Sequence, residues 1–107
     1  MSYELDADCD LPPHLIGLFL RSAPNQLQQL LALCTARDTE GARAQAHKLK
    51  GSLYAAGASR LAERMEALRG ALAAADWRAC EALLVPIRED FASLLKQLAA
   101  RSSTGEP

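Results

Sequence analysis

The apolar residues of this chain recur at alternating steps of three and four positions over most of its length. Such spacing places side chains on one face of an α-helix, and it limits the possible folds more than any other feature. Three stripes follow it: Ala42, Ala46, Leu49, Leu53 and Ala56; Leu61, Met65, Leu68, Leu72 and Ala75; and Cys80, Leu84, Ile87, Phe91, Leu94 and Leu98. The composition agrees, because 21 alanines and 19 leucines accompany only six Val, Ile and Thr residues, the types that strands favour. The sequence therefore predicts an all-α fold.

Proline, glycine and capping residues set the expected helix ends. A short first helix is expected to begin at Pro12 and Pro13, and Pro24 kinks or restarts it before a helix end near Arg37. The other helices are expected over residues 39–56, 59–75 and 76–101, the last with a kink at Pro86. The expected N-caps are Asp38 or Thr39, Ser59 and Asp76, and Gly57 is expected to stop the helix that precedes it.

Connections of only a few residues make neighbouring helices antiparallel. The expected architecture is an antiparallel up-and-down four-helix bundle with a short additional N-terminal helix. Residues 1–10 are expected to form an N-terminal arm, residues 11–101 the bundle domain and residues 102–107 a disordered tail. A chain of 107 residues buries one modest core, which excludes a two-domain enzyme.

Charge and composition exclude several functional classes. The net charge of −1, with both signs interspersed, lacks the basic footprint of a nucleic-acid-binding protein. The longest apolar run, residues 15–20, is far shorter than the ~20 residues of a membrane span. The N-terminus is acidic where a signal peptide is basic, and the widely spaced Cys9, Cys34 and Cys80 indicate neither a disulfide framework nor a zinc site. We therefore expect a cytoplasmic protein that binds neither membrane nor nucleic acid.

The helix expected over residues 39–56 carries a histidine outside its apolar stripe. At about 100° per residue, His47 points about 140° away from the stripe, towards solvent. Its outward flank also carries Arg43, Lys50, Gly51 and Tyr54. Glycine inside an exposed helix costs ~1 kcal/mol relative to alanine, so Gly51 indicates that a partner approaches the helix beside His47. The alternative is that His47 is an ordinary surface side chain.

An exposed imidazole beside a lysine can accept a phosphoryl group. Neutral imidazole is a nitrogen nucleophile at about neutral pH, and a lysine ammonium can neutralise the phosphoryl oxygens. The sequence contains no P-loop, nucleotide-binding glycine motif or metal cluster. The partner is therefore expected to activate the phosphoryl group.

The residues around His47 resemble a known signature. The run from Ala46 to Ser52, with the sequence A-H-K-L-K-G-S, resembles the H-x-L-K-G-[SA] motif of histidine-containing phosphotransfer (HPt) domains, the shuttles of multistep bacterial and fungal phosphorelays. The resemblance covers about residues 15–100. It extends upstream to Phe19, Pro24, Leu27, Leu30 and Asp38, and downstream to Gly57, Ala58 and Leu61.

The resemblance implies a role for each residue of the motif. His47 would carry the phosphoryl group, Lys50 would neutralise its oxygens, and Gly51 would give a receiver domain room to approach. The partners would be receiver domains of response regulators and hybrid sensor kinases. These supply the acidic pocket and the bound Mg²⁺, so this chain would be a phosphotransfer shuttle with no cofactor of its own.

Arg69 departs from the family pattern. Many family members carry Glu or Gln 22 positions after the phosphorylated histidine, where a side-chain oxygen can orient the imidazole. An arginine cannot accept a hydrogen bond. Arg69 either reaches the phosphoryl group, which we favour because Arg43 and Lys50 would complete a basic cluster, or points to solvent.

Two other functions remain open at this stage. The chain could be a non-phosphorylated helical adaptor that docks on receiver domains or kinases through the same face. A dimeric kinase phosphoacceptor domain fits less well, because one chain supplies four bundle helices and is expected to be a monomer. The domain is either free-standing or part of a hybrid sensor kinase.

Overall fold

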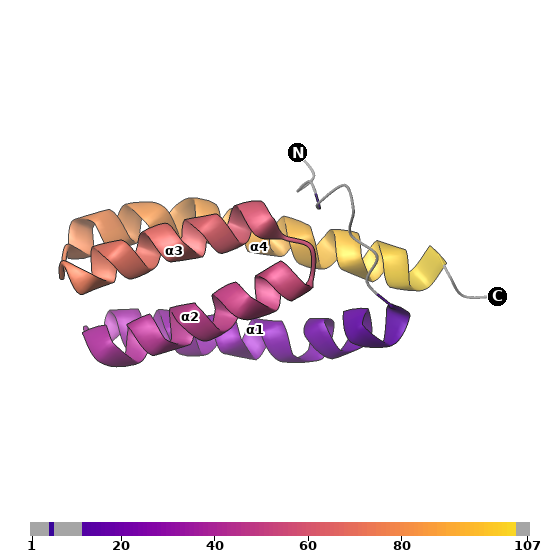
Figure 1. Ribbon diagram of the computed structural model, residues 1–107, viewed down its shortest axis with the longest axis horizontal. Helices are drawn as coiled ribbons and strands as arrows, with labels where there is room; N and C mark the ends of the chain where they lie inside the picture. Colours follow the sequence, from indigo (N-terminus) through magenta and orange to yellow (C-terminus); the bar gives the residue numbers. More distant parts are fainter. Residues whose placement is uncertain (1–4, 6–11, 105–107) are drawn as a thin grey trace.

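The computed structural model describes residues 5 and 12–104 of the chain. It contains four helices: α1 (Pro13–Thr35), α2 (Thr39–Ala55), α3 (Ser59–Ala73) and α4 (Trp77–Thr104). Each helix packs against the next, and α4 packs against α1, which closes an antiparallel up-and-down bundle (Figure 1). The expected all-α class and four-helix architecture are confirmed. None of the described helices combines the length and the hydropathy that crossing a bilayer requires.

The expected short N-terminal helix is not separate. Residues on both sides of Pro24 belong to the single helix α1, and their buried side chains keep one helical spacing: Ile16, Phe19, Ala23, Leu30 and Cys34. Proline removes one backbone hydrogen bond, but the stripe on both sides of it packs on the same core. Burial of this continuous face therefore outweighs the local cost. Helix α4 likewise continues through Pro86, as expected.

The two ends of the chain were expected to leave the bundle. Helix α4 extends to Thr104 rather than ending near Arg101, and residues 105–107 of the expected tail lie outside the described residues. Of the expected arm, only Leu5 is described, and its half-buried side chain packs against the core.

Three short connections join the helices in the same way. Each spans three residues and has one residue with positive φ: Arg37 (59°), Gly57 (78°) and Ala75 (54°). In each, the N–H of the next residue donates to a carbonyl five positions earlier: Asp38 to Leu33 (3.0 Å), Ala58 to Leu53 (2.8 Å) and Asp76 to Ala71 (3.0 Å). This is the Schellman arrangement. This arrangement confirms Gly57 as a helix stop. The prediction that Ala75 belongs to the apolar stripe of the third helix is wrong, because Ala75 is exposed in the connection.

Two of the three predicted N-caps are confirmed. Asp38 Oδ1 accepts a hydrogen bond from the Gly41 N–H (3.0 Å), and Asp76 Oδ1 accepts one from the Ala79 N–H (3.2 Å). Helix α3 differs, because its N-cap is the buried Ala58 and Ser59 is its first helical residue. The backbone N–H of Ala58 completes the Schellman turn of α2, so the cap position falls on Ala58.

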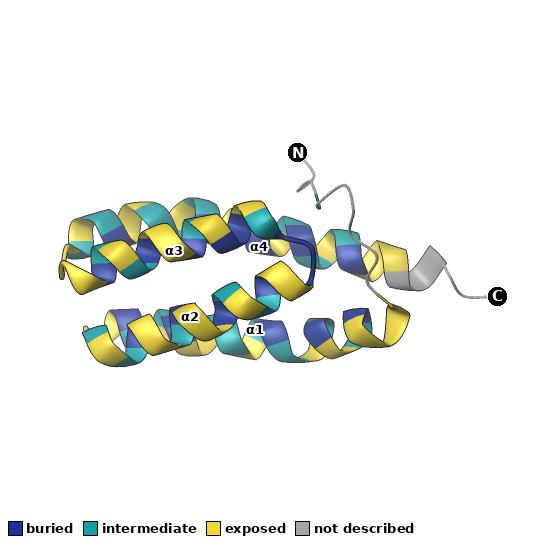
Figure 2. Ribbon diagram, in the orientation of Figure 1, coloured by how far each residue is buried: buried dark blue, intermediate teal, exposed yellow. Residues whose placement is uncertain are grey.

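The core is built from the predicted stripes. All the buried side chains among the described residues are hydrophobic, and the buried positions repeat along each helix (Figure 2). Apart from Ala75, the only stripe residue that is not fully buried is the half-buried Leu84. Phe19 of α1 and Phe91 of α4 stack with ring centroids 6.4 Å apart. Trp77, the first residue of α4, is half-buried against the core and carries the Arg37 guanidinium 4.7 Å above its ring.

Replacement of Ala75 by glycine tests the connection between α3 and α4. A non-glycine residue in the left-handed conformation costs roughly 1–2 kcal/mol, so Ala75→Gly should raise the free energy of unfolding by about 0.5–1 kcal/mol after the extra backbone entropy of glycine. Ala67→Gly is the control, because it removes the same methyl group from an exposed position inside α3 and should lower stability by up to ~1 kcal/mol. Urea denaturation measures both. A loss of stability in Ala75→Gly would contradict the observed turn.

Candidate functional site

His47 lies exposed on α2, on the side of the helix opposite the buried stripe. The stripe residues Ala46 and Leu49 flank it in sequence and are both fully buried. Their burial fixes the rotation of α2 about its axis. The histidine therefore faces solvent, as the helical spacing predicts.

Gly51 follows His47 by one helical turn and is exposed. A Cβ placed on Gly51 would meet no atom within 4 Å, so packing inside the bundle does not require glycine there. Gly70 of α3 has equally open surroundings. Open space alone therefore does not distinguish Gly51. Its position beside His47 does, because residues four apart are neighbours on a helix surface.

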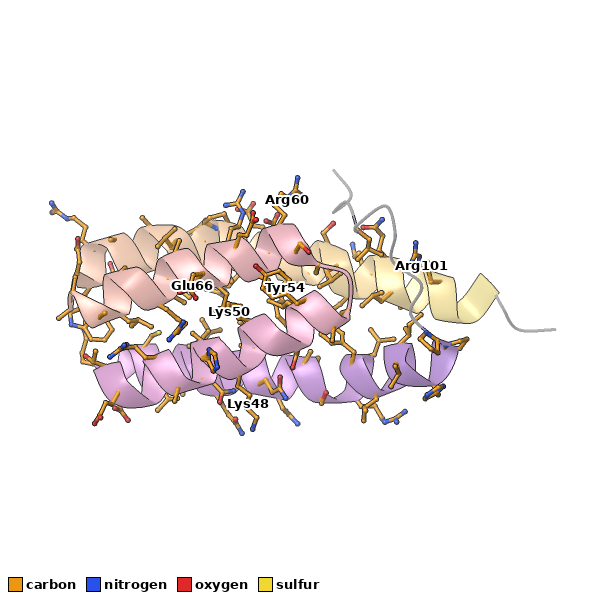
Figure 3. The ribbon with its side chains drawn as sticks, in the orientation of Figure 1. Lys48, Lys50, Tyr54, Arg60, Glu66 and Arg101 are labelled. Atoms are coloured by element: carbon orange, nitrogen blue, oxygen red, sulfur yellow. The ribbon has the colours of Figure 1, made fainter. Side chains whose placement is uncertain are left out.

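Lys50 is bound to a carboxylate on the neighbouring helix. Its Nζ donates to Glu66 Oε2 of α3 at 2.8 Å, and the Lys50 side chain is 22% exposed. Figure 3 shows Lys50 and Glu66 in the space between α2 and α3. Glu66 is not among the site residues that the sequence predicts. It is the residue that connects the histidine-bearing helix to α3 by charge.

Arg69 binds the same carboxylate from within α3. Its Nη1 donates to Glu66 Oε2 at 2.8 Å and to Oε1 at 3.1 Å. Glu66 Oε2 thus accepts from both cations. Arg69 Nε is buried without a hydrogen-bond partner among the described residues. In this structure the Arg69 guanidinium neither points freely into solvent nor joins a purely basic cluster, because a carboxylate neutralises part of its charge.

The two cations hold the pKa of the Glu66 carboxyl below its ordinary value. The hydrogen bond from Lys50 is the larger cause and the one from Arg69 the second. Glu66 is therefore an anion at neutral pH and remains one into acid. The ion pairs of Glu66 with Lys50 and Arg69 are lost only as the pH falls through this lowered pKa, below the ordinary range of a glutamate.

The other two predicted accessory residues lie on the same helix. Arg43 is exposed on α2, and Tyr54 is 49% exposed. Within the described part of the chain, neither side chain makes a hydrogen bond or ion pair with His47, Lys50 or Glu66. The structure therefore brings Lys50 and Arg69 together through Glu66 and leaves Arg43 and Tyr54 on the open face of α2.

A shallow apolar groove of about 180 Å³ lies between α1 and α2, on the flank of α2 away from α3. Its lining residues are Leu15, Leu18, Phe19, Ser22, Ser52, Ala55 and Ala56. Two of them are exposed leucines, Leu15 at 40% and Leu18 at 54%. His47, Gly51 and Ala55 follow one another at four-residue steps along α2. These three residues form a ridge on α2 that runs from the histidine to the groove, and its last two residues are small.

Among the described residues, no group of three or more His, Cys, Asp or Glu side chains could hold a metal ion. A larger cavity of about 350 Å³ lies between α1 and α4 and includes neither His47 nor Lys50 among its lining residues.

Comparison with known families identifies the arrangement. A family model described as Hpt domain matches residues 14–103, which include all four helices nearly in full. No curated protein and no solved structure gives a significant match to the chain.

The pKa of Glu66 gives a direct test of the charge cluster. Lys50→Met and Arg69→Gln should each raise this pKa towards its ordinary value, because each removes one of the two hydrogen bonds that lower it. A carboxyl-carbon NMR titration measures the shift. Arg64→Gln is the control, because Arg64 pairs with Asp90 (3.0 Å) and not with Glu66. An equal shift in the control would show that general charge, rather than these contacts, sets the Glu66 pKa.

Proposed function

The chain belongs to the HPt domain family, whose members transfer phosphoryl groups in phosphorelay signalling and interact with receiver domains, and we propose that His47 carries the phosphoryl group in this member. HPt domains are phosphotransfer shuttles rather than catalytic domains. One observation carries the assignment to His47: it is exposed on α2 with both Lys50 and Gly51 one turn away. The other histidine, His14, lies exposed in the first turn of α1, where Gly17 is one turn away but no lysine is.

The proposed reaction transfers the group from an aspartyl phosphate of one receiver domain and then to another receiver. An imidazole nitrogen of His47 attacks the phosphorus atom, a P–N bond forms, the P–O bond to the aspartate breaks, and the aspartate leaves as a carboxylate. Transfer onward reverses these steps. The receiver supplies the acidic pocket and Mg²⁺, while Lys50 supplies positive charge near the phosphoryl oxygens.

The shape of the α1–α2 face supports docking of a receiver domain. The ridge from His47 through Gly51 to Ala55 has no bulky side chain after the histidine, and the groove beside it exposes Leu15 and Leu18. Exposed apolar surface next to a reactive group is typical of a protein interaction site. We place the receiver on this face, with its active site over His47.

The proposal also covers assembly and location. The four helices of one chain close a complete core, so the domain is proposed to act as a monomer. It is also proposed to act in the cytoplasm. The buried Cys34 and Cys80 are both free thiols, as a reducing compartment favours. A docking adaptor that is never phosphorylated would use the same face, and the transfer experiments below separate it from a shuttle.

Replacement of His47 tests the phosphorylation site. His47→Gln should remain folded, because the side chain lies outside the core, and should accept no label from a radiolabelled, phosphorylated receiver domain. His14→Gln, which removes the other exposed histidine, should accept label as the parent does. The label on the parent should be acid-labile and base-stable, as for a P–N bond. Label retained by His47→Gln would overturn the assignment, and an unlabelled parent would favour the adaptor.

Replacement of Gly51 separates shape from chemistry. Gly51→Gln should raise stability by up to ~1 kcal/mol, because it removes a glycine from an exposed helix, yet it should slow transfer and weaken receiver binding by blocking close approach. Gly51→Ala should be affected much less. Ala82→Gln is the control, since it places the same side chain on an exposed position of α4. Receiver titrations and transfer rates measure the effects, and unchanged transfer in Gly51→Gln would exclude a docking role for the glycine.

A further inference from the structure

The lysine beside His47 already has an anionic partner. Lys50 Nζ lies 2.8 Å from Glu66 Oε2, and the Arg69 guanidinium holds the same carboxylate by contacts of 2.8 and 3.1 Å. A phosphoryl group on His47 would therefore have to compete with Glu66 for the Lys50 ammonium. The two residues that form this network with Lys50, Glu66 and Arg69, both lie on α3.

We propose that Glu66 and Arg69 control how much of the positive charge of Lys50 is available to a phosphoryl group on His47, with Arg69 acting as the replacement cation for Glu66. This inference rests on the proposed function. Arg69 is a positioning residue in this scheme, because it acts through Glu66 and Lys50 and does not touch the phosphoryl group.

The contacts explain how the exchange would occur. The Lys50 side chain is flexible and its ammonium has three donors, so it can turn from Glu66 towards a neighbouring phosphoryl group, which carries more negative charge than a carboxylate. Arg69 reaches both Glu66 oxygens with one nitrogen and lies on the same helix, three residues away. Glu66 therefore keeps a cation when Lys50 leaves it. This lowers the cost of the exchange.

The scheme predicts that replacing Glu66 and replacing Arg69 have opposite effects on the lifetime of phosphohistidine. Without the Glu66 charge, Lys50 has no competing anion and should stabilise the phosphoryl group more. Without Arg69, Lys50 is the only cation that Glu66 contacts and should be held more tightly. Glu66 is half exposed, so solvent screens its ion pairs, and changes of no more than about five-fold are expected.

The test measures the lifetime of phosphohistidine without any receiver domain. Phosphoramidate labels His47 directly: its P–N bond breaks, a new P–N bond to the imidazole forms, and ammonia leaves with the imidazole proton. The first-order loss of label is then followed at neutral pH. Glu66→Gln should lengthen the half-life by up to about five-fold and Arg69→Gln should shorten it by up to a similar factor. Arg69→Lys should retain the parent half-life, because a cation remains.

Combined variants identify the route of the effect. Arg69→Gln should have no effect in the Glu66→Gln background, and Glu66→Gln should have none in the Lys50→Met background. Glu63→Gln, which removes an exposed carboxylate one turn earlier on α3, is the matched charge control and should leave the half-life unchanged. Circular dichroism should show the same fold in every variant, since all these side chains are at least partly exposed.

Four results would overturn the inference, the last of them together with the proposed function. An effect of Arg69→Gln that persists without Glu66 would mean that Arg69 contacts the phosphoryl group directly. An effect of Glu66→Gln that persists without Lys50 would mean simple repulsion between the carboxylate and the phosphoryl group. Half-lives of the Glu66 and Arg69 variants equal to that of Glu63→Gln would exclude any role of the pair. A parent that phosphoramidate does not label at His47 would remove the proposed function, and this inference with it.

Discussion

The burial of one stripe of α2 determines the rest of the site. Ala42, Ala46, Leu49 and Leu53 are all fully buried, so the helix has only one rotation in which its apolar face meets the other helices. A turn of about 100° would place a charged or polar neighbour in the core, where it would lack partners. His47 therefore points to solvent because of the packing on the opposite side of its helix. No contact made by the imidazole itself is needed to hold it there.

The connections between the helices determine which residues of neighbouring helices lie at the same height along the bundle axis. Lys50 lies seven residues before Gly57 and Glu66 lies nine residues after it. In an antiparallel helix pair with a three-residue connection, such residues reach similar heights, and the 2.8 Å contact between Lys50 and Glu66 follows. The Schellman turn at Gly57 thus brings an α3 carboxylate to the lysine of the histidine-bearing helix. A connection of another length would bring a different α3 residue to Lys50.

The sequence predicts what depends on local periodicity and local chemistry, and it does less well where tertiary contacts decide. The stripes predicted the four-helix bundle and the exposure of His47, and Asp38, Gly57 and Asp76 were correctly expected at helix ends. Pro24 was expected to interrupt the first helix, because proline rules describe the local cost and not the packing of Ile16 and Leu30 on either side. Arg37 and Ala75 carry no sequence signal for positive φ, since glycine is the usual sign. No local pattern marks Glu66 as a site residue, because its partner Lys50 lies sixteen residues away on another helix. An estimate of the hairpin register about Gly57 would have suggested the pairing.

The structure separates the residues that hold the histidine from those that adjust its charge environment. The core side chains under α2 are fully buried, and loss of their packing would cost the bundle stability. Lys50, Glu66 and Arg69 are at least partly exposed, and ion pairs in such positions contribute little to folding. Substitutions in the charge cluster can therefore change the environment of a phosphoryl group without loosening the bundle. An arginine at position 69, which cannot accept a hydrogen bond from the imidazole, is compatible with this arrangement because its partner is the carboxylate that holds Lys50.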